Sequence, residues 1–171
     1  MPHLTPLSDE QASSEAKPLF QGIQSAFALV PNIFRSMGHA PAVLQATLAL
    51  NKAIQSDLDP KLRELAYLKA SQVNHCGYCL HYHNGLGRKS GLSDAQVKDL
   101  ENYEKSGAYS DLEKKVLRFA DQWTRKGKAD GELVADLSKS LSQKQLVTLA
   151  ATVGLANWTN RFNETFGVEL P

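Results

Sequence analysis

The sequence is poor in cysteine, with only Cys76 and Cys79 among its 171 residues. A small secreted domain that depends on disulfides uses more cysteines at wider spacing, so a disulfide framework is excluded as the basis of this fold. A bridge that closes so short a loop would also constrain the unfolded chain least. The pair therefore indicates chemistry more than cross-linking.

Excess charge and long apolar runs are also lacking. Nineteen basic residues against eighteen acidic ones leave a formal net charge of +1, which gives no electrostatic case for nucleic acid or an anionic membrane. The longest apolar stretches, such as residues 46–50, are far shorter than the roughly 20 residues that span a bilayer. The first residues lack the charged and apolar regions of a secretory signal. We therefore expect a cytoplasmic protein that binds neither nucleic acid nor membrane.

Short β-branched runs of period two are absent, whereas helical periodicity recurs along the chain. Helix starts are clear. Ser93, Ser110 and Ser142 are each followed three residues later by Gln or Glu, the capping-box pattern. Asp59 and Pro60 supply an N-cap and a proline at the first helical position. The sequence predicts an all-α fold.

These signals divide the chain into expected helices joined by short connections. The expected ranges are residues 15–29, 32–37, 41–56, 61–73, 77–89, 93–103, 110–126, 131–138 and 142–166. Gly91, Gly107 and Gly127 stand where helices should end. Because the connections are short, we expect one domain over residues 1–171, with residues 1–14 as an extended N-terminal segment.

One segment carries residues with chemical potential. Cys76, Cys79 and His83 are spaced three and four apart, so they share one face of a helix that begins near Cys76. A helix N-terminus and a nearby imidazolium both favour the reactive thiolate. His83 can also act as a base, and one cysteine can trap the oxidised other as a disulfide before over-oxidation. The spacing predicts a dithiol redox centre at the start of a helix.

Glu64 lies twelve residues before Cys76, among apolar residues of the preceding helix. A buried carboxylate needs a partner or a shifted pKa. Spacing cannot place Glu64 beside His83, however, and a surface glutamate paired with Arg63 is an equal alternative. The role of this residue stays open at the level of spacing.

Two alternatives compete for the cysteines. Cys76, Cys79 and His83 could bind zinc with His75 or His81 as the fourth ligand. Structural zinc sites usually draw their ligand pairs from two separated segments, which disfavours this set. The cysteines could also be small buried apolar residues. A thioredoxin-type motif would need a preceding strand, and none is evident.

The pattern Glu64-x11-Cys76-x2-Cys79-x3-His83 resembles the core signature of the AhpD-like branch of the carboxymuconolactone decarboxylase superfamily. The surroundings are similar too, over residues 31–35, 41–44, 58–64 and 157–163, so the likeness spans about residues 31–168. It implies an all-helical fold, homo-oligomers that are commonly trimers or hexamers, and thiol-dependent reduction of hydroperoxides.

The resemblance also implies a role for each residue. Cys79 would be the peroxidatic thiol, His83 would promote its deprotonation, and Glu64 would join His83 in a proton relay. Cys76 would be the resolving thiol and the point where an external thiol reductant enters. In the best-known system that reductant is a lipoyl-bearing partner. Neither a bound cofactor nor a metal is implied.

One departure concerns the residues between the cysteines. Well-studied peroxidases of this family often carry a histidine there, whereas this chain has Gly77 and Tyr78. Decarboxylase members lack the CxxC, so its presence argues against lactone decarboxylation. The same dithiol could serve a general disulfide reductase or a non-catalytic redox sensor, and both stay as alternatives to the peroxidase.

Apolar residues complete the set of expectations. From family architecture we expect Phe34 and Met37 to line the pocket around the cysteines. A second group of aromatic residues is expected in the core, with a subunit interface as the alternative. This group is Trp123, Trp158, Phe162 and Phe166.

Overall fold

The computed structural model of the protein describes residues 2–171. Within this range the regular secondary structure is entirely helical, which confirms the expected all-α fold. The helices are α1 (Ala16–Phe27), α2 (Asn32–Met37), α3 (Pro41–Ala53), α4 (Pro60–Val73), α5 (Gly77–Lys89), α6 (Asp94–Lys98), α7 (Asp111–Lys126), α8 (Gly131–Leu137) and α9 (Gln143–Phe166).

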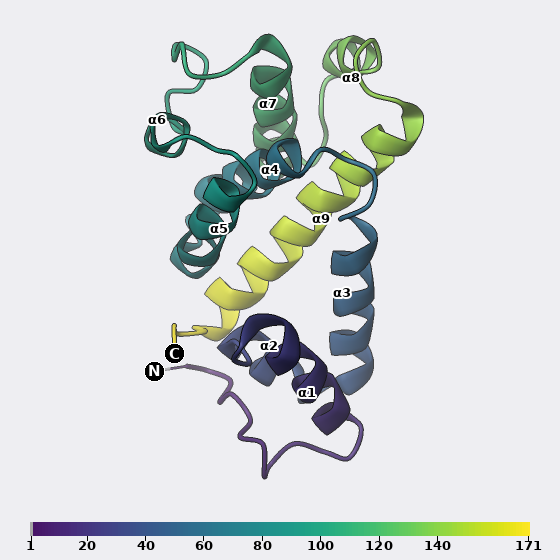
Figure 1. The fold of residues 1–171 in the computed structure, drawn as a ribbon, viewed down its shortest axis with the longest axis vertical. Helices are drawn as coiled ribbons and strands as arrows, with labels where there is room; N and C mark the ends of the chain where they lie inside the picture. Colours follow the sequence, from purple (N-terminus) through teal and green to yellow (C-terminus); the bar gives the residue numbers. More distant parts are fainter. Residues whose placement is uncertain (1) are drawn as a thin grey trace.

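Two helices organise the packing. The 24-residue α9 runs diagonally across the molecule, with α3 on one side and the α4–α5 pair on the other (Figure 1). Helix α4 contacts α5, α7 and α9, which explains why it is buried on several faces. Helices α1 and α2 lie at the end of α9 where the C-terminal residues and the segment after residue 1 also lie (Figure 1). The site residues of α4 and α5 are thereby held against α9.

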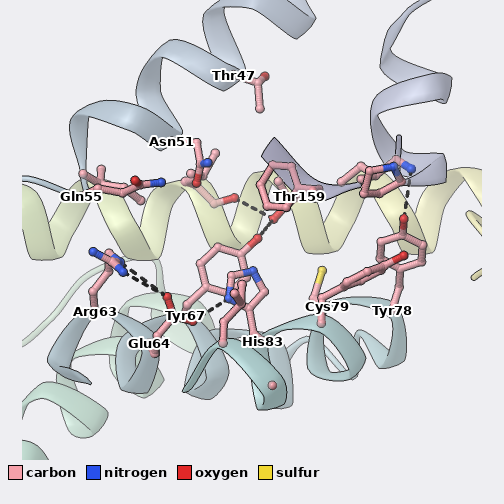
Figure 2. Close-up of a pocket in the computed structure, with 18 of the residues that line it drawn as sticks. Thr47, Asn51, Gln55, Arg63, Glu64, Tyr67, Tyr78, Cys79, His83 and Thr159 are labelled. Atoms are coloured by element: carbon pink, nitrogen blue, oxygen red, sulfur yellow. Dashed lines mark hydrogen bonds and ion pairs between the residues drawn. The ribbon is translucent and has the colours of Figure 1, made fainter. Parts of the chain in front are cut away.

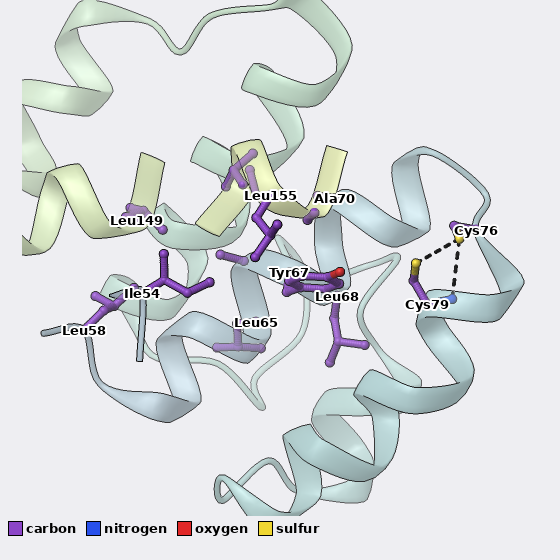
Figure 3. Close-up of a cluster of buried hydrophobic side chains, with 14 of the residues drawn as sticks. Ile54, Leu58, Leu65, Tyr67, Leu68, Ala70, Cys76, Cys79, Leu149 and Leu155 are labelled. Carbon is purple, nitrogen blue, oxygen red and sulfur yellow. Dashed lines mark hydrogen bonds between the residues drawn. The ribbon is translucent and has the colours of Figure 1, made fainter. Parts of the chain in front are cut away.

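A buried apolar cluster joins these helices. Leu65 and Leu68 of α4 and Leu149 and Leu155 of α9 all belong to it. Figure 3 shows that Cys79 lies at the edge of this cluster, next to the start of α5. Burying a leucine side chain contributes about 1.5–3 kcal/mol, so the cluster gives the cysteine-bearing turn a rigid base.

Most helix starts form as the sequence indicates. Capping boxes are present at Ser93, Ser110 and Ser142. Asp59 Oδ1 accepts hydrogen bonds from the Lys61 N–H at 2.9 Å and the Leu62 N–H at 3.2 Å. These bonds satisfy backbone donors that have no partner within the helix. Local chemistry thus sets the entry of four helices.

Helix ends depend more on tertiary contacts, and the expected helix over residues 93–103 is wrong in length. Helix α6 ends after five residues, at Lys98. The Tyr109 hydroxyl donates to the Gln96 carbonyl, and the Ser106 hydroxyl donates to Asp99 Oδ2 at 2.8 Å. Side chains from the following loop therefore replace helical hydrogen bonds with turns.

The three glycines expected at helix ends differ in backbone conformation. Gly91 and Gly127 have φ angles of 97° and 75°, in the left-handed region that glycine adopts at little cost. Gly107 is not among the described residues with positive φ, and it follows turns rather than a helix.

The N-terminal segment is largely irregular, with one turn closed by a hydrogen bond from the Ala12 N–H to the Ser8 carbonyl at 3.1 Å. Residue 1 lies outside the described residues. The His3 N–H donates to the Phe166 carbonyl at 2.8 Å, and Arg35 pairs with Asp9 at 2.8 Å. The segment therefore runs over α2 and the end of α9.

The expected core position of Trp158 is wrong. Its side chain is 43% exposed, and it lies beside the exposed α3 residues Val43 and Leu50. The other aromatic residues of that group, Trp123, Phe162 and Phe166, are partly buried and pack against the core. Among the described residues, no helix combines the length and apolar character needed to cross a membrane.

Candidate active site

The turn between α4 and α5 positions the cysteines. His75 has a positive φ of 55°, which is uncommon for a residue other than glycine. The His75 N–H donates to the Gln72 carbonyl at 3.1 Å, and the Cys76 N–H donates to the Ser71 carbonyl at 2.9 Å. This pair of bonds is a Schellman motif. It ends α4 and places Cys76 as the N-cap of α5, which confirms the expected helix start.

The two sulfur atoms are adjacent. Cys76 Sγ and Cys79 Sγ are 3.0 Å apart as free thiols, so a small approach would bring them to the S–S bond length of about 2.05 Å. Cys76 Sγ also accepts the Cys79 N–H at 3.4 Å. Cys76 has no exposed surface, and Cys79 is 4% exposed. The geometry is that of a pair able to form a disulfide.

A third residue touches the sulfurs and was not found from the sequence. Asn163 of α9 places its Nδ2 atom 3.2 Å from Cys79 Sγ and 3.9 Å from Cys76 Sγ. It lies 84 residues from Cys79 in the sequence, so no spacing rule could link them. The similarity of residues 157–163 to the AhpD-like family was the only signal near it.

The environment distinguishes the two thiols. A hydrogen bond from Cys76 lowers the pKa of Cys79, and donors from Asn160, Asn163 and Thr159 lower it further, although burial opposes them. The pKa of Cys76 is raised, first by donating to Cys79 and then by burial. Cys79 is therefore the thiol of the pair that ionises more readily, and Cys76 the one that holds its proton more tightly.

Glu64 is buried beside His83, which settles the question that spacing left open. The Glu64 carboxylate is 5% exposed, and its Oε2 atom lies 2.8 Å from His83 Nδ1 (Figure 2). Arg63 Nε is 3.5 Å from the other carboxylate oxygen. The alternative in which Glu64 lies on the surface is wrong. Arg63, the partner expected in that alternative, is nevertheless a second partner of the buried carboxylate. A carboxylate on Nδ1 holds that nitrogen as the donor and fixes the imidazole orientation.

Stacking also fixes the His83 ring. The rings of His83 and Tyr67 lie 3.6 Å apart at 14°, and the Tyr67 hydroxyl is hydrogen-bonded to Thr159 Oγ1 at 2.5 Å. Figure 2 shows the second ring nitrogen of His83 on the edge that faces Cys79. Within residues 2–171, however, no hydrogen bond joins His83 to either cysteine.

A cavity of about 510 Å³ opens onto these groups. Cys79, His83 and Glu64 line it, whereas Cys76 does not. Many of the other lining side chains are aromatic or aliphatic. They include Phe27, Ile33, Phe34, Ile54, Tyr67, Tyr78, Tyr82 and Leu86. This volume suits an organic molecule rather than a water-sized one.

Of the two residues expected to line the pocket, one does and one does not. Phe34 lines the cavity, as predicted. The prediction for Met37 is wrong, because its side chain is buried in the core behind the wall. Asn51 of α3, Gln55 in the turn after α3 and Arg63 of α4 line the other end of the cavity (Figure 2). The cavity thus has an apolar part near Cys79 and a polar part near Arg63.

Tyr78 stands where related peroxidases often have histidine, and its hydroxyl is used structurally. It accepts the Ile33 N–H at 3.2 Å, which ties the start of α5 to α2. Burial raises the pKa of Tyr78, so the phenol keeps its proton at neutral pH. This side chain lines the cavity and ties the start of α5 to α2.

The zinc alternative finds no assembled ligand set in the described part of the chain, where no group of three or more candidate side chains gathers for a metal. His75 and His81 are exposed, whereas Cys76 and Cys79 are buried. The four side chains therefore do not converge on one point.

Comparison with known proteins places this site in a family context. The carboxymuconolactone decarboxylase family model matches residues 41–122, a range that contains Glu64, Cys76, Cys79 and His83. The uncharacterized protein YdfG of Bacillus subtilis is 26% identical over 115 residues, which cover 66% of this chain and 78% of that protein.

Solved structures share the fold. The debrominase Bmp8 superposes with a TM-score of 0.83 at 22% identity, over 98% of this chain and 91% of Bmp8. A cysteine-to-alanine variant of Bmp8 was solved in complex with 2,3,4-tribromopyrrole. An alkylhydroperoxidase AhpD core structure, of a peroxidase-related protein from Ralstonia eutropha JMP134, gives a TM-score of 0.86 at 19% identity over 99% and 92%. At these identities the likeness is one of fold.

The family match and the shared fold together confirm the predicted resemblance to the AhpD-like branch of the carboxymuconolactone decarboxylase superfamily. Proteins that share this fold include both a peroxidase-related protein and a debrominase.

Proposed function

We propose that this protein is a thiol-dependent peroxidase that reduces organic hydroperoxides through a Cys76–Cys79 dithiol–disulfide cycle. The observation that carries the proposal is the position of Cys79, whose pKa is lowered, on the wall of a cavity of about 510 Å³ and 3.0 Å from a second thiol. The kinship with AhpD-like proteins supports an enzyme of this type.

The first step is attack by the Cys79 thiolate on the terminal oxygen of the hydroperoxide. The O–O bond breaks, Cys79 becomes a sulfenic acid, and the departing alkoxide takes a proton and leaves as the alcohol. His83 lines the same cavity and is held by Glu64, so it is placed to supply that proton. Glu64 stabilises the imidazolium before the transfer.

In the second step the Cys76 sulfur attacks Cys79 Sγ. An S–S bond forms, the sulfenic hydroxyl leaves, and the proton of Cys76 completes a molecule of water. Two electrons have then passed from the dithiol to the peroxide. Because the sulfurs start 3.0 Å apart, this step needs little movement and protects Cys79 from further oxidation.

An external dithiol returns the two electrons, and a lipoyl-bearing protein is the proposed donor. The expected entry at Cys76 requires the start of α5 to open, since Cys76 is fully buried and does not line the cavity. A slender dithiol arm can instead reach Cys79 through the cavity, with Cys76 as the leaving thiol.

A second candidate is reductive dehalogenation of an aromatic ring, as the debrominase Bmp8 suggests. The favouring observation is the set of aromatic side chains on the cavity wall. The Cys79 thiolate would take bromine from the ring, and the ring carbon would gain a proton. Cys76 would then displace bromide and form the same disulfide. General disulfide reduction and redox sensing use this disulfide as well and remain alternatives.

The test is a turnover assay with dihydrolipoamide as the reductant and cumene hydroperoxide or 2,3,4-tribromopyrrole as the oxidant. We expect Cys79→Ser to abolish hydroperoxide turnover, by more than about 1000-fold. Cys76→Ser should give one turnover and then accumulate sulfenic acid at Cys79.

Full turnover by Cys79→Ser would overturn the mechanism. Turnover of the bromopyrrole alone would favour the debrominase. Oxidation of the wild type by hydroperoxide without recycling would favour the sensor.

We also propose that the chain forms a homo-oligomer, a trimer or hexamer, in the cytoplasm. The exposed side chains of Val43, Leu50 and Trp158 between α3 and α9 support an interface there. Light scattering measures the mass directly, and a mass equal to one chain would contradict the proposal.

A further inference from the structure

Asn163 combines a contact to the reacting sulfur with an unusual hydrogen-bond state. Its side chain is 2% exposed, its Nδ2 atom lies 3.2 Å from Cys79 Sγ, and it lines the cavity. Its Oδ1 atom is buried without a hydrogen-bond partner in the described structure. Buried side-chain carbonyl groups are almost always paired. An asparagine that served packing alone would not be expected to leave this oxygen unpaired.

We propose that Asn163 is a catalytic residue of the thiol centre, whose amide N–H donates to the Cys79 thiolate and holds it toward the cavity. The proposal rests on the peroxidase function in one respect, namely that Cys79 is the nucleophile. The stabilisation of the Cys79 thiolate by the Asn163 amide does not depend on the substrate, so it applies to any reaction in which that sulfur is the nucleophile.

Charge explains the orientation of the amide. A thiolate accepts hydrogen bonds and repels a carbonyl oxygen, so the Nδ2 atom faces the sulfurs and Oδ1 turns away. A hydrogen bond to an ionised group is roughly twice as strong as one between neutral groups. The bond to Cys79 thus offsets the unpaired oxygen for as long as the sulfur is negative.

The neighbours of Asn163 on α9 are already committed elsewhere. Asn160 Nδ2 donates to Ser71 Oγ at 3.0 Å, and its Oδ1 accepts from Asn74 at 3.0 Å. Thr159 Oγ1 is shared with the Tyr67 hydroxyl. These bonds fasten α9 to α4. Asn160 and Thr159 also lower the pKa of Cys79, but among the described residues of α9 only Asn163 makes a hydrogen bond to the cysteine sulfurs. The fixed helix therefore aims one donor at the sulfur.

The charged and titratable side chains around Cys79 come from only one side of the cavity. The titratable or charged side chains that face it from the cavity wall come from α4 and α5. They are Arg63, Glu64, Tyr67, Tyr78, Tyr82, His83 and Lys89. Cys76, the N-cap of α5, faces Cys79 from behind the wall. The wall residues of α2, α3 and α9 are uncharged. Burial raises the pKa values of Tyr67 and Tyr78, so neither competes with Cys79 as an anion.

This distribution assigns different tasks to Asn163 and His83. Asn163 touches the sulfur, whereas His83 Nδ1 touches Glu64. Asn163 therefore sets how readily the thiolate forms, and His83 delivers a proton to the oxygen that leaves. Removing the amide should raise the pKa of Cys79, because a donor to the charged form is lost.

The experiment follows alkylation of Cys79 by iodoacetamide as a function of pH, with the modified cysteine identified by mass spectrometry. The variants are Asn163→Ala and the near-isosteric Asn163→Asp. The control is Asn157→Ala on the same helix, since Asn157 bonds to Thr124 and the Val153 carbonyl rather than to sulfur. Helicity and thermal unfolding verify the fold of each variant.

We expect the midpoint of alkylation to move to higher pH in both Asn163 variants. At pH values below both midpoints, the rate should be about tenfold lower if the pKa rises by one unit. The reduction potential of the Cys76–Cys79 disulfide should also fall, because the reduced state loses stabilisation. Asn157→Ala should leave the midpoint in place. His83→Gln should slow peroxide turnover and move the midpoint less than Asn163→Ala does.

An unchanged midpoint and potential in folded Asn163→Asp would overturn the proposal, as would a larger midpoint shift in His83→Gln. Alkylation needs no peroxide, so the outcome is separate from the test of the peroxidase. A protein with shifted alkylation and no turnover would retain the role of Asn163 and lose the peroxidase function.

Discussion

Glu64 and Glu113 are both buried glutamates, yet their surroundings differ. Glu113 accepts hydrogen bonds from the Ser110 N–H at 2.8 Å, Lys61 Nζ at 2.7 Å and Gln96 Nε2 at 3.2 Å. Each of these donors belongs to a helix start or to the packing between helices. Burial alone would raise the pKa of Glu113, but the bonds from Lys61 and Ser110 outweigh it and hold that pKa below its usual value.

Glu64 has a partner with a second function. Its closest neighbour, His83, presents another nitrogen on the cavity side (Figure 2). The donors to Glu113 are structural, whereas the closest partner of Glu64 lines the cavity. Burial of a carboxylate alone therefore does not point to a catalytic residue. The proposed role of Glu64 rests on the further observation that its partner lines a cavity.

The sharpest test of this comparison replaces each carboxylate by its amide. Glu64→Gln should lower peroxide turnover by about 100-fold, because the imidazolium of His83 loses its counter-charge and the proton transfer slows. Glu113→Gln should leave turnover within about twofold. Steady-state kinetics with cumene hydroperoxide measure both, and equal losses in the two variants would remove the distinction.

The effects on stability should have the opposite order, with Glu113 contributing more to folding than Glu64. Glu113→Ala removes the capping box of α7 and leaves Lys61 without its partner, so we expect a loss of about 2 kcal/mol in the free energy of unfolding. That loss corresponds to a melting temperature about 4–8 °C lower for a chain of this size. Asp111→Ala, in the exposed first turn of α7, is the control. A change below 0.5 kcal/mol in Glu113→Ala, by the order of magnitude of ordinary surface substitutions, would contradict a structural role.

Acid should affect Glu113 in a predictable direction. Because its pKa is lower in the folded protein than in the unfolded chain, its contribution is fully present above the unfolded pKa of about 4.3. It is lost as the pH falls through the lower, folded pKa. Between about pH 5 and pH 3, the free energy of unfolding measured with denaturant should therefore fall less steeply with decreasing pH in Glu113→Gln than in the wild type. An identical slope would show that this carboxylate is not linked to folding.

The smallest expected effect concerns Tyr78, whose hydroxyl is committed to the Ile33 N–H in the way Glu113 is committed to its donors. Tyr78→Phe should cost about 1 kcal/mol of stability and leave turnover nearly intact. Chemical denaturation and steady-state kinetics check the two halves. A loss of turnover comparable to that of Glu64→Gln would show that the phenol takes part in the chemistry.

Local signals explain what could be predicted from the sequence. The ranges of α2 and α5 match their predictions, because Pro31 precedes one helix and the cysteine N-cap precedes the other. Helix α6 was too long in the prediction because Tyr109 and Ser106, from the following loop, decide where it ends. Long-range side-chain contacts override helical periodicity there.

The site divides in the same way. The helical spacing of Cys76, Cys79 and His83 could be predicted because it is local. The contact of Glu64 with His83 depends on how α4 folds back on α5, so only family resemblance indicated it. Asn163 comes from a helix 84 residues from Cys79 and lies outside the reach of spacing arguments.

The central claim is that Cys79 attacks the substrate in the cavity and Cys76 resolves it. The most direct measurement adds one equivalent of cumene hydroperoxide to the fully reduced protein and analyses both products by mass spectrometry. We predict one equivalent of cumyl alcohol together with an intramolecular Cys76–Cys79 disulfide, and in Cys76→Ser a single added oxygen on Cys79. Alcohol formed while both thiols stay reduced, or oxygen added to Cys76 in Cys79→Ser at the wild-type rate, would contradict the account.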